Sequence, residues 1–508
     1  MAEQHFILAH DLGTTGDKAT LFDAVAARPV ATATEPYGTS YPQPNWAEQN
    51  PQDWRRAFIR CTQRLLEQAS VPPASIAAVS FSGHMQCALV VDRAGEPLHP
   101  AIIWADQRAM QQADSIRMVF GEDYIYQLTG HRISPAYTAA KLLWLKENQP
   151  GVYSQIGQVL QPKDYLAYLL TGAFATDFSD ASGSQLFNLT QRCWAEDVIQ
   201  VIGLNPAVFP QVTASATVVG VVNAEAAKAT GLLQGTPVVI GGGDGACATV
   251  GAGSVQEGDT YTYIGSSAWI ALTTRQPIFD PQRRTFNFAH LDPDLYFPIG
   301  TMQAAGGSYS WLEALYRRDQ DGNTLFASMD AAAKAVPPGA NGVLFLPYLL
   351  GERSPYWNPF ARAAFIGLAM SHGWAEMSRA VLEGVAFNLR LILDTLRAQG
   401  IQIEAMRLIG GGARSPLWRQ ILADVFQLPI HLPSLPLEAT ALGAVIAGGV
   451  GVGLFPDYSV ASRLIPASEA EQPDAANRSR YDALYQLFQQ SYVALEPVFT
   501  RLANPQAY

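Results

Sequence analysis

The segment that most constrains the fold is TPVVIGGGDGACATVGAG, at residues 236–253. Val238, Val239 and Ile240 form an apolar run typical of a buried parallel strand, and the three glycines that follow predict a tight turn. Asp244 ends that turn, and the small residues after it favour a closely packed helix. We therefore expect Asp244 at or just before a helix N-terminus, where a carboxylate is electrostatically stabilised and well placed to act as a base.

Two other interpretations of this turn remain open. In the first, the carboxylate is only a helix cap. In the second, Gly241, Gly243 and Ala246 match the G-x-G-x-x-[GA] dinucleotide fingerprint, with Glu257 or Asp259 as the ribose-binding acid. We disfavour the second interpretation, because the acid directly after the glycines would point a negative charge into a loop meant to hold pyrophosphate.

Repeated elements suggest a duplicated chain. MRLIGGGARS, at residues 406–415, repeats the order of an apolar strand, three glycines and a helix. Alternating runs also flank two small-residue tips, DLGTTGDK at 11–18 and GSS at 265–267, and predict two hairpins. Because each half contains one hairpin and one glycine turn, we predict two similar halves that face each other across a cleft.

Length and charge narrow the function classes. A chain of 508 residues exceeds what one hydrophobic core usually supports, and about 150 residues per domain suggests two large domains or three small ones. The formal charge of −11 predicts no general attraction to nucleic acid or to an anionic membrane. Four scattered cysteines form no C-x-x-C pair or Cys/His cluster and indicate reduced thiols in a cytosolic protein: Cys61, Cys87, Cys193 and Cys247.

No segment of the sequence reads as a targeting or membrane element. The amino terminus lacks the basic region and the apolar run of a signal peptide. The most apolar stretch, 439–455, is short and interrupted by glycines, so it predicts a packed helix and turn, not a membrane span.

The first hairpin is suited to binding phosphate. Strands at 6–9 and 19–22 flank its tip, where hydroxyls and backbone N–H groups can surround phosphate oxygens. Asp11 can reach a Mg²⁺ ion there, directly or through water. An ordinary polar hairpin is the alternative. Lys18 does not directly follow Gly16, so this is no P-loop, and the chain has no H-R-D or D-F-G kinase motif.

Two motifs of the first half carry side chains suited to a polyol. SGHMQCALVVD places His84, Met85 and Gln86 where a strand bends. WADQR, which starts at Trp104, sets an aromatic ring beside an acid and a guanidinium, so that the ring can cover C–H surface while the charged groups take hydroxyls. Simple packing of the first motif, and a structural pair of the acid and the guanidinium in the second, are the alternatives.

The remaining periodicity is mostly helical. We predict helices at 138–148, 162–172, 378–396, 418–426, 438–448 and 470–502. The polar segment 176–188 is predicted to be a loop near a site.

Taken in order, the motifs resemble the FGGY family of carbohydrate kinases over nearly the whole chain, and within that family most closely the xylulokinases. They are DLGTTGDK, WAEQNPQDW, SGHMQCALVVD, PAIIWADQR, TAAKLLWLKEN, QPKDYL, GGGDGAC, GSS, LPYLLGERSP, RAVLEGVAF, LIGGGARSPLWRQ and EATALGAV. The resemblance implies an α/β fold of two actin-like (RNase H-like) ATPase domains that close on ATP and sugar. Residues 1–243 would hold the sugar site and the first phosphate hairpin, and 244–508 the nucleotide site, with the last helices packing back on the first domain.

The resemblance also implies an activity, ATP-dependent phosphorylation of D-xylulose at O5 in the cytoplasm, with Asp244 as the base. Sugar, ATP and Mg²⁺ would be the partners, without nucleic acid or membrane, and the oligomeric state stays open, a homodimer included. The sugar would contact His84, Met85, Gln86, Trp104, Asp106, Arg108, Asp244 and Gly245. ATP would contact Asp11, which also serves Mg²⁺, and Gly13, Thr14, Thr15, Lys18, Gly265, Ser266, Ser267, Gly411, Gly412 and Ala413.

Two departures from the family pattern concern the substrate. Xylulokinases usually read Q-M-H-G where this chain has His84, Met85, Gln86 and Cys87. Glycerol kinases have Tyr at the position of Ala136 and an Arg-Glu pair in place of Met85 and Gln86, which argues against glycerol and leaves room for a longer substrate. Ribulose, an alditol and gluconate are therefore alternative substrates, and an actin-like ATPase scaffold without a sugar substrate is the alternative of another class.

Overall fold

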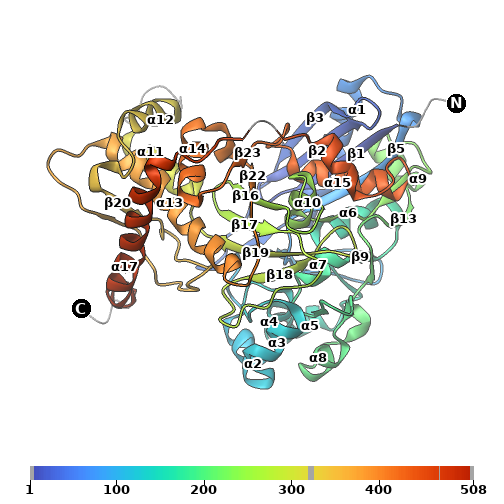
Figure 1. The fold of residues 1–508 in the computed structure, drawn as a ribbon. Helices are drawn as coiled ribbons and strands as arrows, with labels where there is room; N and C mark the ends of the chain where they lie inside the picture. Colours follow the sequence, from blue (N-terminus) through green and yellow to red (C-terminus); the bar gives the residue numbers. More distant parts are fainter. Residues whose placement is uncertain (1–4, 318–324, 468–469, 504–508) are drawn as a thin grey trace.

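The computed structural model describes residues 5–317, 325–467 and 470–503. Two mixed β-sheets, one in each half of the chain, form its centre and are flanked by helices (Figure 1). The first sheet has the order β13-β14-β5-β1-β2-β3, and the second has the order β18-β19-β17-β16-β22-β23. The strands of the first sheet are β1 (Phe6–Leu12), β2 (Gly16–Asp23), β3 (Arg28–Pro36), β5 (Ile76–Gly83), β13 (Val218–Val221) and β14 (Pro237–Val239), and β15 (Gly242–Gly243) pairs with the end of β5. Those of the second are β16 (Thr260–Ile264), β17 (Ala268–Leu272), β18 (Phe286–Ala289), β19 (Tyr296–Met302), β22 (Met406–Ile409) and β23 (Ile430–His431).

The two sheets repeat one topology. In the first, β1, β2 and β3 pair antiparallel in sequence, and β5 and then β14 add in parallel on the other side of β1. In the second, β16, β17 and β19 form the antiparallel part, and β22 and β23 add in parallel beside β16. Two copies of this five-stranded unit confirm the predicted fold class, two actin-like α/β halves.

The glycine turns occupy different places in the two copies. Gly241 to Gly243 follow β14, the fifth strand of the first unit, whereas Gly410 to Gly412 follow β22, the fourth strand of the second. Both turns allow a close backbone approach: a Cβ on Gly241 would lie 1.9 Å from the Phe81 carbonyl oxygen, and one on Gly410 2.6 Å from that of Ile264. The two halves therefore repeat the hairpins and the strand order, but the two glycine turns are not equivalent positions of the repeat. Both turns contain glycine because the backbone passes close to a neighbouring strand at each of them.

Helices surround the sheets. In the first half they are α1 (Pro51–Ala69), α2 (Met110–Phe120), α3 (Glu122–Thr129), α4 (Thr138–Asn148), α5 (Pro150–Tyr153), α6 (Pro162–Thr171), α7 (Phe178–Ser182), α8 (Glu196–Val201) and α9 (Ala224–Thr230). After that they are α10 (Asp244–Gly251), α11 (Gly306–Tyr316), α12 (Phe326–Ala335), α13 (Trp374–Arg397), α14 (Pro416–Phe426), α15 (Ala439–Gly451), α16 (Ala461–Leu464) and α17 (Arg478–Leu502). The short strands are β4 (Glu48–Gln49), β6 (Leu89–Val91), β7 (Ala101–Ile102), β8 (Gln158–Leu160), β9 (Ala175–Asp177), β10 (Phe187–Asn188), β11 (Cys193–Trp194), β12 (Gln211–Thr213), β20 (Leu344–Leu346) and β21 (Ala364–Ile366).

Two sequence predictions need correction. The last helix begins at Arg478 and not at residue 470, because Glu471 pairs with Ile430 in a β-bridge and Pro473 has no N–H to donate to a helix. The segment 176–188 is not a polar loop: it folds into the end of β9, the helix α7 and β10, and most of it is buried. The hydroxyls of Ser179, Ser182 and Ser184 donate hydrogen bonds inside the protein.

Helices α10 and α15 cross between the two halves, as the green and orange-red helices beside β1 and β5 in Figure 1. Their backbones touch: a Cβ on Gly443 would lie 2.1 Å from the Cys247 carbonyl oxygen, and one on Gly251 1.7 Å from that of Ala439. Only glycine permits such contact. Although α15 comes late in the chain, it packs on β1 and β5 of the first sheet.

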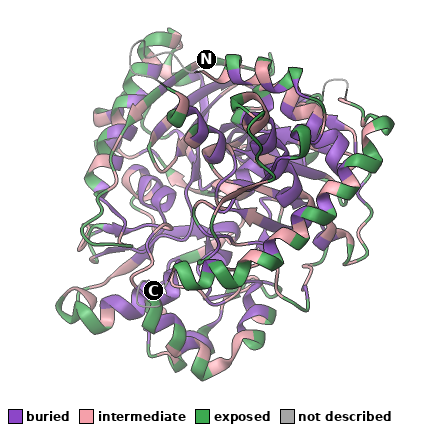
Figure 2. Cartoon of the chain, turned by 90° about the vertical axis from the view of Figure 1, so that its left-hand side faces the viewer, coloured by how far each residue is buried: buried purple, intermediate pink, exposed green. Residues whose placement is uncertain are grey.

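Buried residues gather on the central strands and on the helix faces turned toward them, while exposed residues mark the outer helices (Figure 2). Each half has its own apolar core, and a third cluster around α10 and α15 joins the halves. Among the described helices, none combines the length and the apolar character needed to cross a bilayer.

Candidate active site

Asp244 is the first residue of α10, so the prediction that it lies at a helix N-terminus is confirmed. Asp244 and Gly245 are partly exposed as residues, and Oδ1 of Asp244 accepts a hydrogen bond of 2.7 Å from the backbone N–H of Gly245. Burial, and after it the negative charge of Asp11, raises the pKa of Asp244 to about 7. A carboxylate with a pKa near neutrality can both accept and release a proton at physiological pH.

Asp11 lies near the end of β1, where elements from distant parts of the chain converge. Its Oδ1 accepts a hydrogen bond of 2.9 Å from the Ser82 hydroxyl of β5, and its Oδ2 accepts one from the Thr440 hydroxyl of α15. Burial raises the pKa of Asp11, although both hydroxyls and the charge of Lys18 oppose that shift. A desolvated carboxylate of this kind is stabilised by a nearby cation.

This arrangement fits the Mg²⁺ that the sequence predicts. In the part of the chain that the structure describes, no group of three or more His, Cys, Asp or Glu side chains is arranged to hold a metal ion. Mg²⁺ commonly binds through one or two carboxylates together with phosphate oxygens and water. A single carboxylate such as Asp11 therefore suits an ion that arrives with a nucleotide.

The tip of the first hairpin is tied to its surroundings. The Lys18 ammonium pairs with the Glu438 carboxylate, directly before α15. The Thr14 carbonyl accepts a hydrogen bond of 2.7 Å from Gln49, and the Thr14 hydroxyl accepts one of 3.0 Å from the Trp104 indole. The hairpin predicted to bind phosphate and the aromatic residue predicted to bind sugar are thus in direct contact.

Tyr37, which directly follows β3, also holds the tip of the first hairpin. Its hydroxyl donates to the Gly13 carbonyl, and its backbone N–H donates to the Thr15 carbonyl at 3.1 Å. The Thr15 side chain is exposed and Gly13 is partly exposed. Both residues therefore remain accessible while their backbones are held in place.

The predicted sugar motif after β5 lies against the glycine turn. His84 is 1% exposed, packs edge-on against the Trp54 ring, and has a pKa lowered to about 3, chiefly by burial and also by the charge of Lys141. It is therefore neutral, and neither ring nitrogen has a hydrogen-bond partner among the described residues. Met85 reaches the turn, since a Cβ on Gly243 would lie 2.6 Å from the Met85 sulfur.

Gln86 is held by its backbone. It has a φ of 63° and is 8% exposed. The buried Lys141 ammonium of α4 donates to the Gln86 carbonyl at 2.7 Å and to the Ile103 carbonyl, next to Trp104, at 2.8 Å. One lysine thus connects the two predicted sugar motifs, and burial lowers its pKa to about 7.

Asp106 and Arg108 form the structural pair that the sequence left as an alternative. The Arg108 guanidinium contacts Asp106 at 2.7 Å and Glu48 at 2.8 Å, and it stacks over the Trp46 ring with 3.7 Å to the ring centre. Both charged groups are almost completely buried. Their polar atoms are therefore engaged inside the protein, whereas Trp104 of the same motif is partly exposed.

The second half provides a hairpin and a pocket. The hairpin tip at Gly265, Ser266 and Ser267 abuts the start of α11, where the backbone N–H groups of Ala305 and Gly307 donate to the Ser266 carbonyl. Ser266 is exposed, and Gly265 and Ser267 are partly exposed.

Near the second glycine turn, Gly411 is exposed, Gly412 packs on Ile264, and Ala413 borders a pocket of about 320 Å³. The pocket is lined by Ala413, Arg414, Arg419, Leu432, Ser434, Leu435, Pro436, Leu437 and Glu438. Its volume is that of a small-molecule site. Because Glu438 pairs with Lys18, the pocket adjoins the first hairpin.

Sequence reasoning missed several residues that complete this region. Ser82 and Thr440 bind Asp11, Gln49 holds the hairpin, and Lys141 joins the sugar motifs. All four belong to motifs quoted above, but their roles depend on contacts between distant segments. Only Gln49, within WAEQN, carried a local signal, a polar side chain between aromatic residues.

A duplicated actin-like fold with two electrostatically coupled carboxylates between its halves is the architecture of a phosphotransferase. Models of the FGGY family of carbohydrate kinases match the chain, the N-terminal domain over residues 6–251 and the C-terminal domain over residues 260–452. The chain belongs to the FGGY family of carbohydrate kinases.

Individual relatives match over nearly the full length. The chain is 34% identical over 490 residues to the xylulose kinase of Escherichia coli (strain K12), covering 96% of this chain and 99% of that relative. The crystal structure of xylulose kinase from Rhodospirillum rubrum superposes with a TM-score of 0.88 at 31% identity, covering 98% of this chain and 100% of the other. The crystal structure of gluconate kinase from Lactobacillus acidophilus superposes with a TM-score of 0.90 at 27% identity, covering 98% and 99%.

Proposed function

We propose that this protein transfers the γ-phosphoryl group of ATP to the O5 hydroxyl of D-xylulose. The observation that carries the proposal is Asp244, a partly exposed residue whose carboxylate has a pKa of about 7, on a glycine turn that contacts the Met85 side chain. Similarity to xylulose kinases over nearly the full chain supports the choice of sugar. Domain boundaries at 1–243 and 244–508 are part of the proposal.

In this mechanism the protein mainly aligns the reactants, since phosphoryl transfer needs little covalent chemistry from side chains. Asp244 accepts the proton of the sugar hydroxyl late in the transfer. Mg²⁺ bound at Asp11 would neutralise charge on the transferred group. Closure of the two halves excludes water, which would otherwise compete with the sugar as acceptor.

We assign the remaining contacts as follows. The sugar contacts the side chains of His84, Met85, Gln86 and Trp104. The buried ion pair of Asp106 and Arg108 stabilises the segment that carries Trp104. The ribose and base of ATP occupy the pocket at Ala413, and the two hairpin tips hold its phosphates. The orphaned His84 ring nitrogens support this assignment, because a buried donor and acceptor without protein partners are well suited to a sugar hydroxyl.

Gluconate is the second candidate substrate. The likeness to the gluconate kinase structure favours it, as does the departure of His84 and Gln86 from the usual xylulokinase order.

A sugar panel tests the proposal. ATP consumption is measured with D-xylulose, ribulose, gluconate, xylitol and glycerol, and without acceptor, and the phosphorylated position is determined by ³¹P NMR. We expect D-xylulose to give the highest kcat/KM and a 5-phosphate product. A higher kcat/KM with gluconate would change the assigned substrate to gluconate, and the proposed phosphoryl transfer would still hold. Equal ATP hydrolysis with and without acceptor would instead indicate an ATPase scaffold.

The rate should depend on pH through Asp244. A base acts in its deprotonated form, and the pKa of Asp244 in the free protein is about 7. We therefore expect kcat/KM for the sugar to fall by about tenfold per pH unit below neutrality and to level off above about pH 8. A profile that stays flat between pH 5.5 and 8 would contradict the assignment of Asp244 as the base.

A further inference from the structure

A buried charge cluster lies beneath the glycine turn. Its centre is the ammonium of Lys163 in the first turn of α6, which is fully buried and lies 2.7 Å from Asp164, 3.0 Å from Asp177 and 3.2 Å from Asp180. Burial disfavours the lysine charge, but the three carboxylates outweigh that effect and raise the pKa of Lys163 well above its usual value. The lysine is therefore a permanent cation inside the first half.

Hydrogen bonds lead from this cluster to the backbone beside Asp244. The second oxygen of Asp177 accepts from the Ser179 hydroxyl at 2.6 Å and from the Ser215 hydroxyl at 2.7 Å. The Ser179 hydroxyl oxygen in turn accepts the backbone N–H of Gly243 at 2.9 Å. The Ser215 carbonyl accepts the N–H of Gly241 at 3.0 Å, so the two serines hold both ends of the glycine turn.

The glycine turn packs so closely against Ser179 and Asp177 that a larger residue at position 242 would not fit. A Cβ on Gly242 would lie 2.9 Å from the Ser179 hydroxyl and 3.4 Å from the Asp177 carboxylate, so the turn fits directly against the two side chains. Gly242 and Gly243 also pair with Ser82 and Gly83 at the end of β5.

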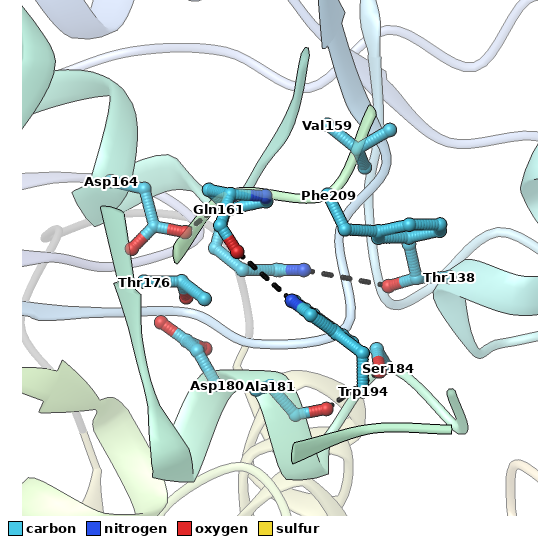
Figure 3. A pocket seen from close by; sticks show the side chains of 11 residues that line it. Thr138, Val159, Gln161, Asp164, Thr176, Asp180, Ala181, Ser184, Trp194 and Phe209 are labelled. Carbon is cyan, nitrogen blue, oxygen red and sulfur yellow. Dashed lines mark hydrogen bonds between the residues drawn. The ribbon is translucent and has the colours of Figure 1, made fainter. Parts of the chain in front are cut away.

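Two residues of the cluster, Asp164 and Asp180, also border a small cavity, and Figure 3 shows them close to Thr176 on one side of it. Its volume of about 10 Å³ is close to that needed for one water molecule. The Thr176 hydroxyl and Oδ1 of Asp180 have no hydrogen-bond partner among the described residues, whereas Oδ2 of Asp180 faces the Lys163 ammonium. Burial raises the pKa of Asp180 well above its usual value, and the charge of Lys163 opposes that shift.

We propose that Asp177, with Lys163 as its counter-ion, positions the catalytic turn through Ser179 and Ser215. These are positioning residues, because they act through the backbone at Gly243 and do not touch the reactants. The inference rests on the proposed role of Asp244 as base. Its importance follows from geometry: a displacement of about 1 Å in a reacting group can lower a rate by about 100-fold.

Ser179→Ala tests the proposal, with Ser184→Ala as the matched control. Ser184 is equally buried and has two hydrogen bonds, to Ala181 and Leu186, that do not involve the turn. We expect Ser179→Ala to lower kcat by about 10- to 100-fold with the KM for ATP within about twofold of wild type. The control should keep kcat within about twofold. Ser179→Cys, which fills the site with a slightly larger side chain whose sulfur accepts hydrogen bonds only weakly, replaces the alanine variant if that variant does not fold.

A second readout separates positioning from general damage. In an Asp244→Asn background, single-turnover formation of labelled sugar phosphate should not fall further when Ser179 is also replaced, because the base that the turn positions is already absent. Equal losses from the two serine variants, or an undiminished Ser179 effect in that background, would overturn the proposal. If the wild-type protein phosphorylated no sugar, the proposed function would fail instead, so the two failures are distinguishable.

Discussion

Asp244→Asn is expected to lower kcat by about 100- to 10,000-fold while ATP binding stays nearly unchanged. The substitution keeps the size of the side chain and removes its ability to accept a proton, and the glycine turn remains in place. The assay is steady-state sugar phosphorylation at pH 8, together with ATP affinity from calorimetry. A variant with a near-normal rate would exclude Asp244 as the base.

The same variant should be more stable than wild type at pH 8. The pKa of Asp244 is about 7 in the folded protein against an ordinary value of 3.8, so the folded state retains a proton that the unfolded state has lost between those values. The free energy of unfolding therefore falls as pH rises from about 4 to 7. Above pH 7 the buried carboxylate is charged in the folded protein, and its full destabilising effect is present. Asparagine carries no such penalty. We expect a higher Tm for the variant at pH 8 and a much smaller difference at pH 4, and this serves as the control that the variant is folded.

Asp11→Asn is expected to weaken Mg²⁺-dependent activity by about 10- to 100-fold, because it replaces the carboxylate that would bind the ion. It should also shift the pH profile. The charge of Asp11 contributes to the raised pKa of Asp244, so its removal lowers that pKa and moves the acid limb of kcat/KM to lower pH. Titration of activity with MgCl₂ at several pH values measures both effects.

The control for Asp11→Asn is Asp53→Asn, which removes the same charge from an acid in α1 that pairs with the exposed Arg56. It should change neither the Mg²⁺ requirement nor the pH profile. An Asp11 variant that saturates at the wild-type Mg²⁺ concentration would rule out Asp11 as the metal ligand, and an unmoved acid limb would show that the two carboxylates are not coupled.

Much of the fold could be predicted because the local signals were strong. The first hairpin and the helix start at Asp244 both follow apolar strands and contain small residues. The structure confirms both elements, although the hairpin strands extend to Leu12 and begin again at Gly16, so the tip is shorter than the predicted segment 11–18. The relation between the two glycine turns could not be predicted in this way. The residues around Gly241 and Gly410 are alike, but whether each follows a fourth or a fifth strand depends on sheet order, which local sequence does not encode.

The site was predicted less completely, for a related reason. Thr440 and Asp11 are 429 positions apart in the chain, and Ser179 and Gly243 are 64 positions apart, so no spacing rule links either pair. Asp106 and Arg108 show the opposite case. Their charges suggested contact with a ligand, yet Glu48 and Trp46 enclose the guanidinium, a partnership that only the folded chain reveals.

The glycine contacts between α10 and α15 bear on how such a molecule can move. Because the backbones of the two helices touch at Gly251 and Gly443, we expect α10 and α15 to move as one rigid unit. This unit begins at Asp244 and contacts Asp11 through the Thr440 hydroxyl. We expect the base and the metal ligand to keep their separation while the outer parts of the halves swing. Sugar acceptors of different length could then be accommodated by movement of the outer parts of the two halves, while the distance between Asp244 and Asp11 stays the same.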